Sequence, residues 1–337
     1  MKKLSLIYSL ELFPLFNIFT KYRTTVFMMH RFCKWGDRKG GLVPHLPTDI
    51  LDRCLQYLKE NNYSVIPLSE YVQRLKDTTG LHKTVVLTVD DGYQDFYYYA
   101  YPVLRKYNMP AAVFIVSDFI DGDTELWWDQ IESAINSSVD NEIEINMDGE
   151  RLLFPLRDKR EREYAIKQIV EYCKTILQDH RCQLIEQIKR ILNVNSISTM
   201  QKKTPQALSW DQIREMQDNS VEFFPHTKTH PILTRCAEEI IIREVSESKR
   251  KLESKIGRPA DIFCYPNGRH SDLDDRVIAL LKRSGYTAAF TAESGYDYAR
   301  GKIDFFRLRR YPFPEDFISF KRLVSGLEAC ISLFKKI

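Results

Sequence analysis

Two adjacent acids, Asp90 and Asp91, follow a run of β-branched and apolar residues that reads TVVLTV. Carboxylates at the end of a buried strand need a metal, a cation or hydrogen bonds to offset their desolvation. Neighbouring side chains on an extended chain point in different directions, so one acid can bind a metal while the other faces a reacting water. The structural alternative is a helix N-cap, because aspartate caps helices well and a helix is predicted from Tyr93 onward.

A second pair of metal-binding residues lies in the sequence HTKTH, which places His226 and His230 four residues apart. If this segment turns helically, the two imidazoles share one face, which is a common spacing for metal ligands. With Asp91 they offer two nitrogens and one oxygen. That set suits zinc, leaves room for water, and tolerates cobalt, nickel or iron. The alternative is a polar loop that precedes Pro231.

The composition describes an ordinary globular protein. The chain has 337 residues, 44% of them hydrophobic and 28% charged, which predicts a packed core. A formal charge of only +3 gives no reason to expect a nucleic-acid partner. The seven cysteines are scattered without CxxC pairs, which argues against a disulfide framework and favours a reducing compartment.

Short apolar runs alternate with helical patterns along the chain. The predicted strands are residues 26–30, 63–67, 84–89, 111–116, 221–225, 261–265, 287–291 and 305–308. This β-α alternation predicts an α/β fold with a parallel sheet, closed into a barrel. Active residues of such barrels lie at the carboxyl ends of strands, and Asp90, Asp91, His226 and Asn267 all follow predicted strands.

At this point the residues resemble a family. TVDDG is similar to the TFDDG motif of polysaccharide deacetylases, the NodB-homology or carbohydrate esterase family 4 group, and HTKTH followed by PILT is similar to their H-[ST]-x-x-H metal motif. The resemblance implies a deformed (β/α) barrel and metal-dependent removal of N-acetyl groups from an amino sugar, with an N-acetylated glycan as partner. It makes Asp90 the general base, and Asp91, His226 and His230 the ligands of a divalent metal, most simply zinc.

The third family motif, R-P-P-Y-G, is altered to CYPNG over residues 264–268. The resemblance makes the backbone N–H of Asn267 the donor to the oxyanion and places Tyr265 beside the substrate. The family arginine that orients the base is replaced by Cys264. Arg310 is the predicted substitute, with Arg307 and Arg309 as rivals, and the alternative is surface charge on a strand.

The family's C-terminal L-x-H motif is missing, because no histidine follows His270. His30 instead ends the first predicted strand. This arrangement resembles a circularly permuted subgroup that includes the poly-N-acetylglucosamine deacetylases, and it makes His30 the general acid. The alternative is a hydrogen-bonded core histidine.

The predicted organisation has a catalytic domain over residues 25–313, interrupted by a mostly helical insertion at about residues 121–205 with a small hairpin at 141–154. Trp128, at the start of the insertion, is a candidate for stacking on a sugar, with core packing as the alternative. Residues 1–24 form an apolar segment that docks on a membrane interface, anchors as a signal, or packs in the core. Residues 314–337 are predicted to form one amphipathic helix. It is either an ordinary surface helix or a segment that attaches to an anionic membrane.

These features predict a cytoplasmic protein that associates with the inner membrane if its terminal segments dock there. Two other functions stay open. One is a deformylase, or another non-sugar amide hydrolase, with the same metal site. The other is a degenerate protein that binds glycan without cleaving it.

Overall fold

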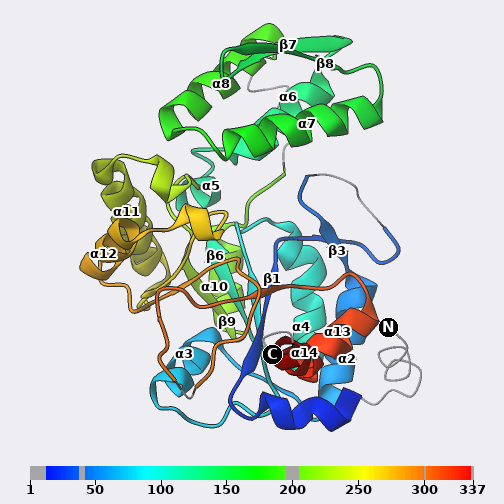
Figure 1. Cartoon of the computed structure of the whole chain (residues 1–337), viewed down its shortest axis with the longest axis vertical. Helices are drawn as coiled ribbons and strands as arrows, with labels where there is room; N and C mark the ends of the chain where they lie inside the picture. Colours follow the sequence, from blue (N-terminus) through cyan, green and yellow to red (C-terminus); the bar gives the residue numbers. More distant parts are fainter. Residues whose placement is uncertain (1–12, 38–41, 195–204, 300, 335–337) are drawn as a thin grey trace.

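A parallel sheet forms the centre of the computed structural model, which describes residues 13–37, 42–194, 205–299 and 301–334 (Figure 1). Its strand order is β12-β1-β5-β6-β9, and β4 pairs with the start of β5. The strands are Thr24–Met29 (β1), Ser64–Val65 (β4), Thr84–Val89 (β5), Ala111–Ile115 (β6), Val221–Pro225 (β9) and Tyr311–Pro312 (β12). Every residue of β5 and β6 is buried, as in parallel strands that are covered on both faces.

A second parallel ladder pairs β10 (Ile262–Cys264) with β11 (Ala288–Phe290) and continues the ring. A bridge between Phe290 and Leu308 joins β11 to the segment that leads into β12, and β9 lies in contact with β10. The molecule is therefore an α/β deformed barrel, which confirms the predicted fold class. A strand at residues 305–308 is wrong apart from that bridge, because the chain turns where the Arg307 N–H donates to the Asp304 carbonyl.

Amphipathic helices cover the barrel. They are Thr48–Glu60 (α2), Leu68–Lys76 (α3), Tyr101–Tyr107 (α4), Trp210–Gln217 (α10), Glu238–Ile256 (α11) and Asp275–Arg283 (α12). The shorter elements are Arg31–Cys33 (β2), His45–Pro47 (β3), Phe96–Ala100 (η2, a π-helical turn), Ser117–Asp121 (α5), Leu233–Arg235 (η3) and His270–Asp272 (η4). In α2, for example, Leu51, Leu55 and Leu58 are buried at helical spacing, so one stripe faces the strands.

The segment between α5 and α10 forms a separate layer at the top of Figure 1. Its elements are Trp127–Ser137 (α6), Glu142–Met147 (β7), Glu150–Pro155 (β8), Lys159–Cys173 (α7) and Gln178–Ile191 (α8). The turn between β7 and β8 has Asp148 and Gly149 at positive φ, as two-residue hairpins require. This insertion has its own apolar core, and Tyr93, Val116 and Phe119 from the barrel join it.

The first and last described elements of the chain pack together at the far side of the barrel from the insertion (Figure 1). The 3-10 helix η1 (Phe13–Thr20) packs against α14 (Leu327–Phe334), and α13 (Phe317–Val324) precedes α14. One continuous helix over residues 314–337 is wrong, because the chain breaks at Gly326, whose φ is 81°. Residues 1–12 of the predicted apolar segment lie outside the described residues. No helix in the described part of the chain is long and apolar enough to span a bilayer.

Candidate active site

The two adjacent acids diverge at the end of β5. The Asp90 N–H donates to the Met29 carbonyl and so continues the ladder with β1, whereas Asp91 has a left-handed φ of 75°. Gly92 follows at a φ of 88°, where a Cβ would lie 3.0 Å from the side chain of Ile120. This sharp turn sends the two carboxylates to different partners, and both are almost completely buried.

Arg310 holds the Asp90 carboxylate in a two-pronged ion pair. Its Nη1 and Nη2 donate to the two carboxylate oxygens over 2.7 Å and 2.8 Å. The same guanidinium donates to the Thr88 hydroxyl, the Thr291 carbonyl and the Cys264 sulfur, and its side chain is 1% exposed. Burial opposes ionisation of Asp90, but the charge and hydrogen bonds of Arg310 outweigh it and hold the Asp90 pKa below its ordinary value. Asp90 is therefore a carboxylate.

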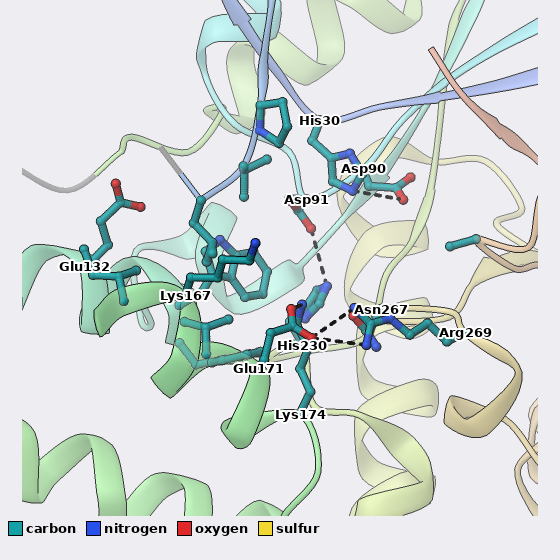
Figure 2. Close-up of a pocket in the computed structure, with 18 of the residues that line it drawn as sticks. His30, Asp90, Asp91, Glu132, Lys167, Glu171, Lys174, His230, Asn267 and Arg269 are labelled. Carbon is teal, nitrogen blue, oxygen red and sulfur yellow. Dashed lines mark hydrogen bonds and ion pairs between the residues drawn. The ribbon is translucent and has the colours of Figure 1, made fainter. Parts of the chain in front are cut away.

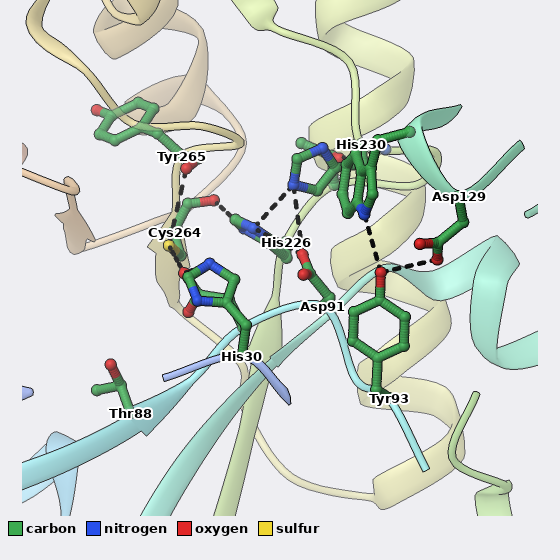
Figure 3. Close-up of polar contacts among 12 residues, drawn as sticks. His30, Thr88, Asp91, Tyr93, Asp129, His226, His230, Cys264 and Tyr265 are labelled. Atoms are coloured by element: carbon green, nitrogen blue, oxygen red, sulfur yellow. Dashed lines mark hydrogen bonds and ion pairs between the residues drawn. The ribbon is translucent and has the colours of Figure 1, made fainter. Parts of the chain in front are cut away.

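Asp91, His226 and His230 face one another across a small buried space (Figure 3). Asp91 Oδ1 lies 3.7 Å from His226 Nε2 and 3.5 Å from His230 Nε2, and the two Nε2 atoms are 3.2 Å apart. Two ligands of a tetrahedral zinc ion, at their usual bond lengths of about 2.0–2.2 Å, stand about 3.4 Å apart. The three atoms therefore have the spacing of a metal ligand set.

The chemical state of these groups also fits a cation. Burial lowers the pKa of His226 to about 4 and that of His230 well below its ordinary value, so both imidazoles are neutral. Burial and the charge of Asp90 raise the pKa of Asp91, so an ionised Asp91 needs a positive neighbour. Asp91 Oδ2 has no hydrogen-bond partner among the described residues. A divalent metal would meet each of these needs.

The histidine segment is a loop and not the helical turn that its spacing suggested. Thr227 and His230 have left-handed φ values of 67° and 61°, and the Thr227 hydroxyl accepts from the His230 N–H. Glu244 on α11 accepts hydrogen bonds from the backbone N–H groups of Lys228 and Thr229. His226 Nδ1 donates to the Cys264 carbonyl over 2.8 Å, which leaves its Nε2 free for the metal.

Two other clusters of potential ligands fit a metal less well. Asp90, His226 and Cys264 lie close together, but Arg310 already occupies both oxygens of Asp90. In the group of Asp118, Asp121 and Asp123, Lys251 already forms ion pairs with the first two.

The metal-ligand set opens into a cavity of about 920 Å³ between the barrel and the insertion (Figure 2). His30 lies on its wall, with Nε2 3.8 Å from Asp90 Oδ2 and a side chain that is 33% exposed. Asn267 also lines the cavity, and its left-handed φ of 61° turns the chain there. Residues of α6 and α7 form the opposite wall, so the insertion covers the site.

Other predicted site residues lie differently from expectation. Tyr265 borders the cavity but is only 1% exposed, and its hydroxyl donates to the Phe306 carbonyl, so its ring packs in the core. Trp128 lines the cavity but is 6% exposed, so it is no open stacking platform. By contrast, Arg310 lines the cavity and holds Asp90, as expected of the substitute for the family arginine, while its rivals Arg309 and Arg307 are engaged by Asp297 and Asp275.

Sequence reasoning missed several residues that shape the site. Tyr93 and Asp129 are buried and linked by a hydrogen bond, and Glu244 braces the histidine loop. Tyr93 directly follows the DDG motif and Asp129 directly follows Trp128, so their positions beside motif residues were the available signal. Glu244 lies within a charged helix pattern and gives no such signal.

Comparison with known proteins agrees with this geometry. Residues 77–289 match the sequence model of the family described as Polysaccharide deacetylase. Over 251 residues the chain is 23% identical to Poly-beta-1,6-N-acetyl-D-glucosamine N-deacetylase of Escherichia coli strain K12, a match that covers 74% of this chain and 31% of that protein. The chain thus corresponds to less than a third of the length of this curated relative.

Two solved structures share the fold. Streptococcus pyogenes deacetylase PplD, in complex with acetate, has a TM-score of 0.57 at 18% identity, over 88% of this chain and 95% of that chain. IcaB from Ammonifex degensii has a TM-score of 0.57 at 14% identity, over 90% of this chain and 97% of that chain. At these identities the likeness establishes the fold alone.

Proposed function

Because the chain belongs to the polysaccharide deacetylase family, we propose that it hydrolyses the N-acetyl group of an amino sugar in a polysaccharide, an oligosaccharide or a lipid-linked glycan precursor. One observation carries the proposal: a buried set of Asp91, His226 and His230 lies beside an arginine-bound carboxylate at the inner end of a large cavity. In the reaction the oxygen of water adds to the acetyl carbon, the carbon–nitrogen bond breaks, and acetate and a free amine result.

The family is metal-dependent, and we propose that Asp91, His226 and His230 hold a divalent ion, with zinc first and cobalt, nickel or iron as alternatives. Such an ion supplies Lewis acidity, which polarises the acetyl carbonyl and makes water easier to deprotonate. The second imidazole nitrogen of His226 is tied to the Cys264 carbonyl, which supports a fixed ligand orientation.

Three other residues transfer protons or stabilise the negative charge that develops in the reaction. Asp90, kept ionised by Arg310, accepts a proton from the attacking water. His30, on the open side of Asp90, donates a proton to the departing nitrogen. The backbone N–H of Asn267 donates to the oxygen that becomes negative in the tetrahedral intermediate.

The opposite wall of the cavity supports a glycan as the substrate. One face of α7 presents Lys167 and Glu171 to the cavity, and Lys174 follows directly after the helix (Figure 2). Charged groups of both signs suit the hydroxyl groups of a sugar. Arg269 from the barrel reaches across to Glu171 over 3.3 Å. We propose that this face of α7 contacts the sugar that carries the acetamido group, or the sugar next to it.

The first experiment measures acetate release from N-acetylglucosamine oligomers and formate release from the matching N-formyl sugars, with and without a chelator. We expect acetate, no formate, and loss of activity after chelation that zinc or cobalt restores, because the carbonyl is activated by the ion. Release of formate from N-formyl sugars, without acetate from the acetylated ones, would favour the deformylase alternative. Binding of the oligomers with neither product would favour a glycan-binding protein.

We also propose that the chain attaches peripherally to the inner membrane through η1 and α13, which pack against each other. Leu15 and Ile18 on η1 are 71% and 72% exposed, and Ile318 on α13 is 52% exposed. Apolar side chains of this kind insert at a bilayer interface, and Lys21 beside η1 adds positive charge.

The double variant Leu15→Ser and Ile18→Ser is therefore expected to lose most of its sedimentation with anionic vesicles, since the apolar contact is removed. The matched control is Val139→Ser, which changes a 94%-exposed apolar residue of the insertion. Equal sedimentation of the double variant and the control would contradict this attachment.

A further inference from the structure

Tyr93 lies in the loop after β5 that also carries Asp91, and it connects this loop to the insertion through two hydrogen bonds (Figure 3). Its hydroxyl donates to Asp129 Oδ2 over 2.8 Å and accepts from Trp128 Nε1 over 2.9 Å. All three residues are buried, at 0%, 6% and 4% exposure for Tyr93, Trp128 and Asp129. The arrangement fixes the indole of Trp128 at the first turn of α6.

The ring of Trp128 in turn contacts a metal-ligand histidine. Its centroid lies 4.6 Å from that of His230, and the two planes meet at 77°. His226, the other histidine of the set, is oriented by the hydrogen bond from its Nδ1 to a carbonyl. His230 Nδ1 is buried and has no hydrogen-bond partner within the described ranges of the chain. On the Nδ1 side, away from the proposed metal, the orientation of His230 therefore depends on packing.

We infer that Tyr93, held by Asp129, is a positioning residue that fixes Trp128 and through it the ring of His230. This inference rests on the proposed metal site. A metal-ligating histidine is normally oriented by an acceptor at its second nitrogen, and loss of that support typically weakens metal binding by about 10–100-fold. Here the T-shaped packing against an anchored indole takes the place of that acceptor and holds the His230 ring in position.

Tyr93 is itself rigid enough for this role. The Arg31 guanidinium lies 4.2 Å from the centre of its ring, and Phe119 packs edge-on against it at 5.4 Å. Arg31 is fixed by an ion pair of 2.6 Å with Asp95. The anchor thus joins β2, the loop after β5 and α6. The insertion is consequently part of the metal centre as well as a wall of the cavity.

The test is the zinc affinity of Tyr93→Phe, measured by competition with a chelating dye, together with the visible spectrum of the cobalt-loaded protein. We expect zinc binding about 10–100-fold weaker than in the parent chain and a changed cobalt spectrum, which reports ligand geometry. Tyr71→Phe is the matched control, because Tyr71 is 0% exposed and its hydroxyl has no hydrogen-bond partner among the described residues. It should leave both readouts unchanged.

Two further variants keep the test decisive. Trp128→Phe removes the indole N–H and should weaken zinc binding as Tyr93→Phe does, which serves if Tyr93→Phe does not fold. Asp129→Asn keeps an acceptor for the Tyr93 hydroxyl and should stay close to the parent affinity. Parent-like zinc affinity and cobalt spectra in both Tyr93→Phe and Trp128→Phe would overturn the inference. If His226→Ala also bound zinc like the parent chain, the proposed metal site itself would be misplaced.

Discussion

Replacing Asp90 by asparagine is expected to lower acetate release by about 10²–10⁴-fold, the usual contribution of a general base. An amide cannot accept the proton of the attacking water. Bound metal should stay near one equivalent, because Asp91 and the two histidines are unchanged. The measurement is the steady-state rate on N-acetylglucosamine oligomers, with metal content determined on the same samples. An unchanged rate at full metal occupancy would show that Asp90 is not the base.

The same variant should also be less stable. Arg310 is 1% exposed and would lose the carboxylate that balances its charge, and breaking a buried ion pair in this way typically costs about 3–5 kcal/mol. His30→Gln provides the comparison. It removes the proposed acid and should slow the reaction too, but His30 is 33% exposed and no buried cation depends on it, so the free energy of unfolding should stay close to that of the parent chain.

Replacing His226 by alanine is expected to remove both bound metal and activity. The variant deletes one of three buried ligands, and the remaining pair cannot complete the site. Metal content after dialysis and acetate release are the two measurements. His180→Ala is the matched control, since His180 is an exposed histidine on α8 and should change neither. A full equivalent of tightly bound metal in His226→Ala would place the metal elsewhere.

The two variants test separately whether Asp90 is the base and whether His226 binds the metal. Asp90→Asn should give a loaded but slow protein, whereas His226→Ala should give an empty and inactive one. If both lost metal equally, the adjacent acids would share one role, contrary to the divergent directions that the left-handed Asp91 gives them.

The sequence predicted the barrel and the groups at its strand ends because both follow from local patterns. Buried strands read as apolar runs, and residues that follow parallel strands meet at one edge. Arg310 was a candidate because it follows another predicted strand, and in the structure its guanidinium contacts the Asp90 carboxylate. The path of the histidine loop was not predictable, because left-handed φ values at Thr227 and His230 leave no mark in residue type.

Side-chain direction was a second limit. Tyr265 and Trp128 were placed near the substrate by position, but burial and hydrogen bonds to Phe306 and Tyr93 decide where they point. These contacts join residues far apart in the chain. The closure of the cavity by α7 has the same origin, since it arises from long-range packing and not from any local pattern.

The insertion has a core of its own, which carries a consequence for how such a chain can change over generations. Substitutions on the cavity face of α7 leave the barrel strands and the Asp90–Arg310 pair untouched, so on the proposed function they can alter which glycan is accepted without loss of the proposed hydrolytic groups. The first turn of α6 is hydrogen-bonded to the loop after β5, through Trp128 and Tyr93. Selection for a new substrate therefore has most of a separately folded unit to work on, while a single turn must stay fixed.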